Sequence, residues 1–333
     1  MISPLDVRDA HWLLQQPFTA PAWIIEDLIS TGLHLLVGAP KLGKSWLVLE
    51  MGLNVSRGEP FWGFATAKCD VLYLCLEDTF SRIQQRLWRI TDEAEPGFNF
   101  AIAAEKIPAG LVNQLEEFLA AHPATRLVVI DTFQAVRQAN GDNSYAVDYR
   151  DLTTLKQFAD KHNLAILVVH HTRKMSDSDV FNTVSGTTGI TGCADSTFVL
   201  EKESRCTNSA KLSLTGRDVE FQELQLRFSD CHWLIVAKTS PEELAERLVP
   251  DAVLRVLDFM ATRPGAWEGT ATGLIADAGI GDVSVAVLGK YLAQHQAFLR
   301  ERGITYTRRH MRSGNILALE HSSCGEGGDS CEG

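Results

Sequence analysis

The stretch LHLLVGAPKLGKS, residues 33–45, decides the fold, because an apolar, strand-like run leads directly into a glycine-rich loop. Gly38 and Gly43 enclose four variable residues and are followed by Lys44 and Ser45, and a helical run, WLVLEMGLNVSR, comes next. Glycines at these positions permit a tight turn whose amides face phosphate oxygens, and the helix N-terminus behind the loop favours an anion. The full match to G-x-x-x-x-G-K-[ST] in this context predicts a nucleoside triphosphate site rather than a chance glycine-rich turn.

Within this stretch, both side chains and main-chain amides are expected to contact the nucleotide. Lys44 would add positive charge at the β- and γ-phosphates, and the Ser45 hydroxyl would be a ligand of Mg²⁺. We expect the nucleotide to contact nine residues, which are Gly38, Ala39, Pro40, Lys41, Leu42, Gly43, Lys44, Ser45 and Trp46.

Length and composition set outer limits. A chain of 333 residues can hold two domains. A net charge of −11 argues against a protein whose whole surface binds nucleic acid, but it does not exclude a small basic surface that does so. Seven cysteines without paired zinc-type spacing, and the absence of a signal peptide or a bilayer-length apolar run, predict reduced thiols in a cytoplasmic protein that does not contact a membrane.

Strand-like and helical segments alternate after the loop. Apolar runs at 70–78, 126–131 and 163–174 read as buried strands, and 81–90 and 145–162 read as helices. This alternation predicts an α/β fold with a parallel sheet and helices on both faces. Shorter alternating pieces (DSTFVLEKE, AKLSLTGRD, ELQLRF) predict antiparallel strands that extend the sheet, giving a mixed, mainly parallel one.

Polar residues follow three of the predicted parallel strands, at the edge where ligands bind in such sheets. Asp131, at the end of RLVVID, would hold Mg²⁺, and Glu77 would orient the attacking water. Asp78 is the alternative, although helix capping suits it better. Adjacent strand residues point to opposite faces, so only one of His170 and His171 is expected to face the nucleotide.

Two further features have competing interpretations. Arg217, in LTGRD after a strand, is a candidate arginine finger acting in trans, or a surface ion pair with Asp218 or Glu220. The aromatic cluster in RGEPFWGF could stack on a base, but core packing is the favoured interpretation.

Beyond residue 238 the composition changes. Three expected helices and a hairpin between 250 and 321 are in the order of a winged-helix-like domain. The hairpin carries Arg308, Arg309 and Arg312, which either contact a phosphate backbone or belong to a solvated hairpin. The predicted organisation is a lead-in at 1–30, a core domain at 31–238, a small domain at 239–321 and a disordered tail at 322–333.

With these residues in hand, the chain resembles the RecA-fold AAA family ATPases of the RepA type, relatives of the hexameric replicative helicases of plasmids and mobile elements. The resemblance covers roughly residues 20 to 230. Its motifs, in order, are GAPKLGKS, YLCLEDTFSRIQQRL, LVVIDTF, LVVHHTRK, SGTTGITGCADSTFVL and LTGRDVEFQELQLRF.

The resemblance implies a RecA-like P-loop core that uses ATP and Mg²⁺, with Glu77 as the catalytic carboxylate, Asp131 as the second-motif acid and a histidine such as His171 as the γ-phosphate sensor. It also implies a hexameric ring, with ATP at subunit interfaces and single-stranded DNA in the channel. Arg137, Arg173 and Lys174 would then contact DNA phosphates.

Two other functions stay open at this stage. One is a nucleotide-switched assembly ATPase that recruits a replication or mobile-element partner without unwinding, and the other is a recombinase-like mediator of the same fold.

Overall fold

The computed structural model describes residues 7–17, 22–138, 144–171, 181, 192–202, 207–239, 243, 249–281, 283–311 and 314–321. The chain divides into two compact units, Met1–Thr239 and Ser240–Gly333, and each is described by itself.

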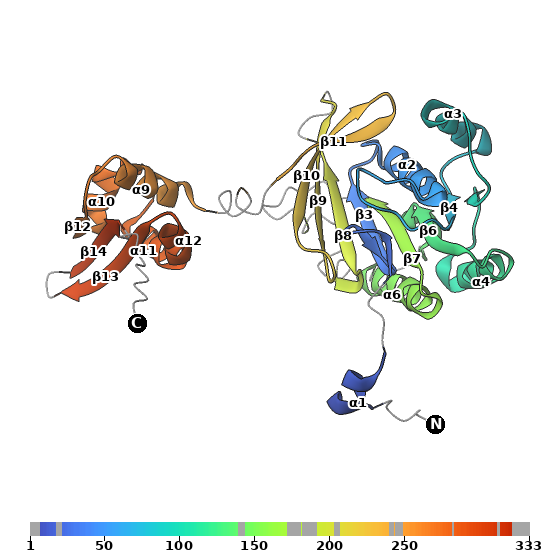
Figure 1. Cartoon of the computed structure of the whole chain (residues 1–333), viewed down its shortest axis with the longest axis horizontal. Helices are drawn as coiled ribbons and strands as arrows, with labels where there is room; N and C mark the ends of the chain where they lie inside the picture. Colours follow the sequence, from blue (N-terminus) through green and yellow to red (C-terminus); the bar gives the residue numbers. More distant parts are fainter. Residues whose placement is uncertain are drawn as a thin grey trace, which may run out of the picture. The chain divides into compact units, whose positions relative to one another are not determined.

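The first unit is built on a nine-stranded sheet with the order β11-β10-β9-β8-β3-β7-β6-β4-β5 (Figure 1). Neighbouring strands from β8 to β5 are parallel, and β9, β10 and β11 are added antiparallel at one edge. The expected α/β class with a mixed, mainly parallel sheet is therefore confirmed. The strands are β3 (Gly32–Gly38), β4 (Asp70–Cys75), β5 (Phe98–Ala101), β6 (Thr125–Asp131), β7 (Ala165–His171), β8 (Ser196–Glu201), β9 (Ser209–Gly216), β10 (Gln222–Ser229) and β11 (His232–Lys238).

Strand β3 is central because it is paired on both sides and every one of its residues is buried. Its alternation sends Leu33, Leu35 and Val37 into one core layer and Leu36 into the other. Helices α2 (Lys44–Arg57) and α3 (Phe80–Ile90) cover one face, and α4 (Val112–Ala121) and α6 (Ser144–His162) cover the other (Figure 1).

The aromatic cluster of this unit includes Phe61 and Trp62. The ring of Phe61 is buried and stacks on Trp62 at 4.4 Å, and the indole Nε1 of Trp62 donates to the carbonyl of Trp233 at 2.6 Å. The aromatic cluster of RGEPFWGF therefore packs in the core, as the sequence favoured.

The smaller elements of this unit are α1 (Ala10–Gln15), β1 (Trp23–Ile25), β2 (Ile29–Ser30), the π-helical turn η1 (Ile107–Leu111) and α5 (Phe133–Val136).

The second unit has its own core and a three-stranded antiparallel sheet with the order β12-β14-β13. The last of the three expected helices, which the sequence places over residues 283–303, is in fact two helices: α11 ends at Gln294 and α12 begins at Gln296, with His295 at φ −104° and ψ 26° between them. The short strand β12 was not predicted. The elements are α9 (Asp251–Ala261), β12 (Trp267–Thr270), α10 (Ala271–Asp277), α11 (Val285–Gln294), α12 (Gln296–Glu301), β13 (Ile304–Met311) and β14 (Gly314–His321).

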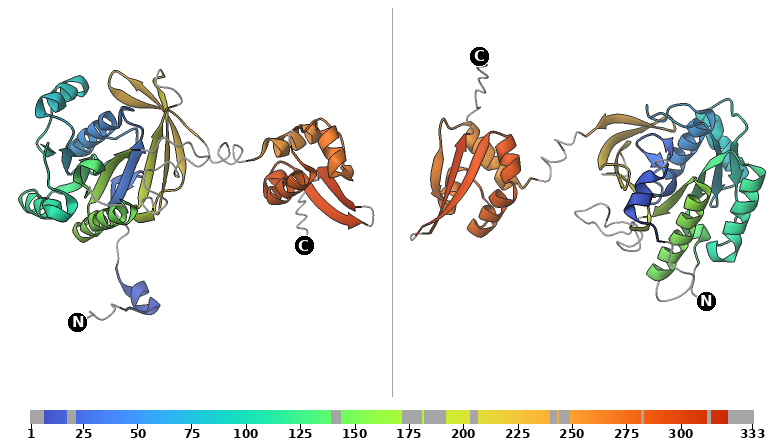
Figure 2. Two further views of the ribbon diagram at one scale, coloured as in Figure 1. Left: turned by 180° about the vertical axis from the view of Figure 1, so that it is seen from behind. Right: turned by 60° about the horizontal axis from the view of Figure 1, so that its bottom comes forward.

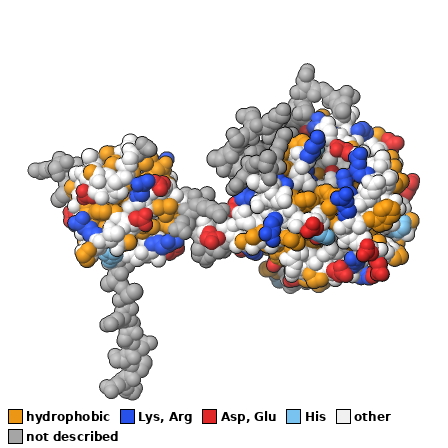
Figure 3. All heavy atoms as spheres, turned by 90° about the horizontal axis from the view of Figure 1, so that it is seen from above, with side chains coloured by type: hydrophobic (Ala, Val, Ile, Leu, Met, Phe, Trp, Pro, Cys, Tyr) orange, Lys and Arg blue, Asp and Glu red, His pale blue; other side chains and the backbone are white. Residues whose placement is uncertain are grey.

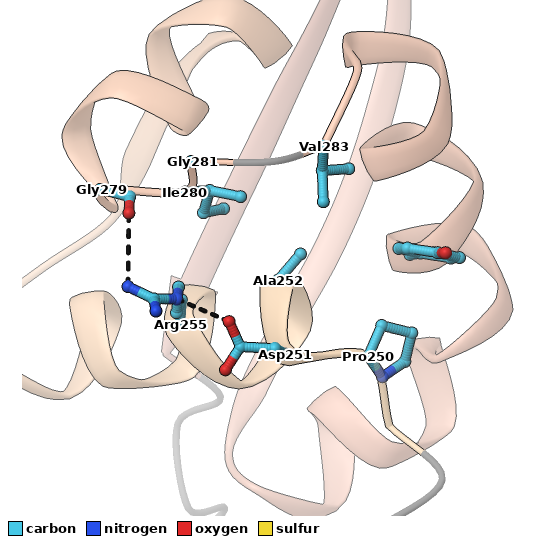
Figure 4. A pocket seen from close by; sticks show the side chains of 9 residues that line it. Pro250, Asp251, Ala252, Arg255, Gly279, Ile280, Gly281 and Val283 are labelled. Atoms are coloured by element: carbon cyan, nitrogen blue, oxygen red, sulfur yellow. Dashed lines mark hydrogen bonds and ion pairs between the residues drawn. The ribbon is translucent and has the colours of Figure 1, made fainter.

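A hollow of about 410 Å³ lies in this unit, beside the start of α9. Figure 4 shows the side chains that line it. Arg255 donates to the carboxylate of Asp251 at 2.7 Å and to the carbonyl of Gly279 at 3.4 Å, so the guanidinium at this hollow is already paired within the unit. The residues that line the hollow include none of the predicted site residues.

Charged side chains of both signs are interspersed over the face of each unit seen in Figure 3. Within the described part of the chain, no helix combines the length and the apolar character needed to cross a bilayer.

Candidate nucleotide-binding site

The glycine-rich loop joins β3 to α2 and has the backbone that its sequence predicts. Gly43 lies in the left-handed region at φ +96°. A Cβ on Gly38 would be 2.7 Å from the carbonyl oxygen of Leu200, so a side chain there would collide with the main chain of β8. Both glycines are therefore required by the path of the chain.

Lys44 is buried at the first turn of α2, and its ammonium group lies against the loop. Its Nζ donates to the carbonyls of Gly38 at 2.7 Å and Ala39 at 3.0 Å. Burial lowers the pKa of Lys44 from 10.5 to about 8, although the charges of Asp131 and Glu77 oppose the shift. A polyanion over the loop would oppose it further, because negative charge stabilises the ammonium form.

Asp131 ends β6 and is held by two hydroxyl groups. Its Oδ2 accepts from Ser45 Oγ at 2.7 Å and from the Tyr73 hydroxyl at 2.9 Å. Burial raises the pKa of Asp131, while these two hydrogen bonds and Lys44 act in the opposite direction. A carboxylate beside a serine hydroxyl is a hard oxygen donor set of the kind that binds Mg²⁺ together with phosphate and water, so these residues fit the ion.

Glu77 follows β4 and is exposed. Its Oε1 accepts a hydrogen bond from Thr132 Oγ1 at 2.8 Å, and Thr132 directly follows Asp131. Its Oε1 is thus anchored beside the Asp131 end of β6.

The neighbouring Asp78 is engaged elsewhere. It forms ion pairs with Arg82 at 2.9 Å and Arg86 at 2.5 Å. The expectation that Asp78 caps the next helix is wrong, because the side chain of Thr79 accepts from Arg82 N at 3.3 Å and caps α3. These contacts favour Glu77 over Asp78 for any role near the phosphate loop.

The two histidines at the end of β7 diverge, as their adjacency requires. His171 Nδ1 is 3.3 Å from Lys44 Nζ, on the side of the phosphate loop. His170 is buried, and its ring meets that of Phe133 edge-on at 5.5 Å. His171 is therefore the one of the two that lies beside the phosphate loop.

Arg217 lies at the opposite end of the sheet from the loop of its own chain. Gly216 pairs with Ser196, which pairs with His34, and His34 is four residues before Gly38 on β3. At about 3.3 Å per residue, this places Gly216 ~13 Å from the level of the loop. The Arg217 side chain is 58% exposed, contacts Asp195 at 3.5 Å, and makes no contact with Asp218 or Glu220 that the structure records.

The predicted DNA contacts have varied surroundings. The guanidinium of Arg137 donates to both carboxylate oxygens of Asp148 on α6, each at 2.9 Å. Arg308 and Arg309 are exposed on β13. Arg173, Lys174 and the side chain of Arg312 lie outside the described residues, as does the predicted tail.

Sequence reasoning missed Trp233, which supports the loop from behind. Its fully buried indole donates from Nε1 to the carbonyl of Gly43 at 3.1 Å. Glu50, on α2, accepts from the Trp233 amide at 3.3 Å and lies 3.0 Å from His232 Nδ1. The hairpin of β10 and β11 is thereby fixed to the loop and its helix.

Tyr73 and Thr132 were missed as well, although each had a sequence signal. Tyr73 is a hydroxyl-bearing residue inside an otherwise apolar strand, and Thr132 is the neighbour of the predicted metal-binding acid.

Comparisons with known proteins bear on the fold and the family of this chain. A search of curated protein sequences finds no match to this chain. Among solved structures, the chain is similar to the "ATPase Domain of G40P", with a TM-score of 0.50 and 15% identity over 62% of this chain and 85% of that one. It is also similar to a structure described as a DnaB-like replicative helicase and its interactions with primase, with a TM-score of 0.51 and 14% identity over 61% of this chain.

The chain spans 57% of that helicase chain, and identities at this level show a shared fold alone, which is the RecA-like ATPase fold. A profile of the AAA domain family matches residues 2–177, more than half of the sequence. The chain belongs to the AAA domain family and contains a P-loop ATPase domain of that type.

Proposed function

We propose that this protein is a Mg²⁺-dependent ATPase that assembles into a hexameric ring and acts on single-stranded DNA as a RepA-like helicase, in the replication of a plasmid or mobile element. The observation that carries the proposal is the convergence of three groups at one edge of the sheet. These are Lys44 on the loop, the Ser45–Asp131 pair, and Glu77 held by Thr132.

Each group has a distinct task in phosphoryl transfer to water. Lys44 binds the β- and γ-phosphates, and His171 beside it senses the γ-phosphate. Ser45 and Asp131 would hold Mg²⁺, which would neutralise charge on the phosphate oxygens when bound. Thr132 occupies Glu77 Oε1, leaving Oε2 to orient the attacking water and receive its proton.

Charge relief in the transition state comes from a neighbouring copy. Arg217 cannot reach its own chain's loop, since it lies at the other end of the strands, but its exposed side chain is available to a neighbour. An arginine supplied in trans at a subunit interface makes hydrolysis depend on assembly.

The proposed DNA contacts come from both units of the chain. In the second unit, helices α9, α10 and α11 and the sheet β12-β14-β13 would serve as a winged-helix-like module, and the exposed Arg308 and Arg309 suit a phosphate backbone. Arg312, together with Arg173 and Lys174 of the core, would add contacts of the same kind.

A strand-displacement assay tests the proposal. The wild-type protein should unwind a forked duplex with ATP and Mg²⁺. Glu77→Gln should bind ATP and fail to unwind, and Lys44→Ala should lose nucleotide binding. ATP bound normally by Lys44→Ala would refute the assignment of the loop.

A second candidate is a nucleotide-switched assembly protein that recruits a replication partner without unwinding. One observation favours it, because the Arg137 guanidinium is already paired with Asp148 and is therefore less available to DNA. In that case the wild-type protein would hydrolyse ATP and assemble but leave the duplex intact.

A further inference from the structure

The carbonyl of Gly43 accepts three hydrogen bonds at the turn from the phosphate loop into α2. Two donors are the amides of Trp46 at 3.1 Å and Leu47 at 3.2 Å, which belong to the first turn of the helix. The third is the indole Nε1 of Trp233 at 3.1 Å, which comes from β11, 190 residues further along the chain. A donor from outside the helix therefore helps to determine where this carbonyl points.

The direction of this carbonyl sets the direction of the next amide. The Gly43–Lys44 peptide is trans and planar, so the carbonyl of Gly43 and the N–H of Lys44 point in opposite directions. Because the carbonyl points to the indole, the N–H of Lys44 points away from this buried ring. Lys44 is the first residue of α2, and N–H groups at this position have no partner within the helix and can bind phosphate.

The ring of Trp233 also packs against the main chain of Gly43. A Cβ built on Gly43 would be 3.3 Å from two indole atoms, Cζ2 and Nε1, so the ring faces the side from which a side chain would project. The indole is fully buried, so no solvent competes with its N–H donor. The packing and the hydrogen bond thus act on the same residue, whose backbone is left-handed at φ +96°.

Trp233 is itself fixed on its main chain and on its ring. Its amide donates to Glu50 Oε2 at 3.3 Å, and its carbonyl accepts from the indole of Trp62 at 2.6 Å. Phe228 packs on the ring with 5.0 Å between the ring centres, and Lys202 Nζ lies 5.2 Å from the ring centre. The indole donor therefore has one defined position.

The contact with Glu50 fixes the helix as well as the loop. Glu50 is seven residues after Gly43, about two helical turns, so both residues lie on the same face of α2, ~10 Å apart along its axis. Figure 2 shows the β10–β11 hairpin, in tan, beside α2, in blue. The helix cannot slide or rotate against this hairpin without breaking one of the two contacts.

We infer that Trp233 is a positioning residue for the nucleotide, because its indole N–H holds the Gly43 carbonyl in the direction that aims the amide of Lys44 at the phosphates. The inference rests on the proposed function for the nucleotide itself. Since Trp233 is fully buried, it acts through the donors of the loop and not by contact with the nucleotide. These donors contact phosphate both before and during hydrolysis, so loss of the indole donor should weaken the binding of substrate and transition state equally.

Steady-state ATPase kinetics of Trp233→Phe test the inference. Phenylalanine keeps a ring beside Gly43 and removes the N–H donor, so KM for ATP should rise about three- to tenfold, as expected for the loss of one hydrogen bond. The value of kcat should stay within about twofold of the wild type. A substitution that merely reduced the folded fraction would instead lower kcat and leave KM unchanged.

Two further variants separate the donor from the packing. Benzothienylalanine in place of Trp233 keeps both rings and lacks the N–H, so it should raise KM as phenylalanine does, and it tests the donor alone if phenylalanine leaves too large a cavity for folding. The control Trp267→Phe removes a buried indole whose Nε1 donates to Asp277 at 2.9 Å in the second unit, and it should change neither constant. An unchanged KM in either folded Trp233 variant would overturn the inference.

The proposed function and this inference fail differently. If Lys44→Ala binds ADP as the wild type does, the nucleotide site itself is contradicted. Loss of ADP binding in Lys44→Ala, together with an unchanged KM in the Trp233 variants, would contradict only the role of the indole.

Discussion

Replacing Thr132 by valine tests the positioning of Glu77. Thr132 is 3% exposed, and its hydroxyl donates to Glu77 Oε1 at 2.8 Å. Valine keeps the shape of the side chain and removes the donor, so the fold should be retained while the carboxylate loses its anchor.

The size of the effect follows from the environment. Hydrogen bonds to charged groups contribute about 1.5–3 kcal/mol, and the lower end applies here because Glu77 is exposed and water competes for its oxygens. A loss of about 1.5 kcal/mol from the transition state is a roughly tenfold decrease in kcat. KM for ATP should change little, since Thr132 has no role in holding the phosphates.

Steady-state ATPase kinetics measure the two constants, with Thr132→Ser as the matched variant that keeps the hydroxyl. Serine should restore most of the rate. An unchanged kcat in Thr132→Val, alongside an inactive Glu77→Gln, would refute the claim that Thr132 positions Glu77.

Three further changes probe the rest of the site and its core. Tyr73→Phe removes one of the donors to Asp131, so the Mg²⁺ concentration needed for half-maximal hydrolysis should shift, and an unchanged Mg²⁺ titration would argue against a positioning role. Gly43→Ala places a Cβ at φ +96° and 3.3 Å from the Trp233 ring, and urea unfolding should show a loss of about 1–3 kcal/mol with weaker ATP binding; a fully stable variant would contradict the strain. Burial lowers the pKa of His34 from 6.5 to about 4, so the folded protein binds fewer protons at this site than the unfolded chain does. The free energy of unfolding therefore falls as the pH drops from 6.5 towards 4, by about 3 kcal/mol at most. His34→Gln should lack this component, so the difference in unfolding free energy between the two proteins should change between pH 7.5 and pH 4.5, and a constant difference would contradict it.

The parallel part of the fold was predictable because its signals are local. A fully buried strand such as β3 is a continuous apolar run, and the glycines, lysine and serine after it have a fixed spacing. Strands of one parallel sheet end at a common edge, so Glu77 and Asp131 could be placed together before any contact was known.

Contacts between distant segments were not predictable in this way. Trp233 is 190 residues from Gly43, and nothing in the local pattern around it indicates a partner on the phosphate loop. The pairing of Arg137 with Asp148 also depends on how α6 packs, which charge and spacing alone do not determine. The break between α11 and α12 was missed because the apolar period continues through His295 without a proline or glycine.

The central claim is that a triphosphate lies across the carboxyl edge of the sheet, between the ammonium group of Lys44 and the carboxylate of Glu77. An experimental structure with Mg²⁺ and a non-hydrolysable ATP analogue tests it most directly. The account predicts the γ-phosphate within hydrogen-bonding distance of Lys44 Nζ, with Glu77 Oε2 facing it across one water. A nucleotide bound elsewhere, or a Glu77 side chain turned away from the phosphates, would contradict the account.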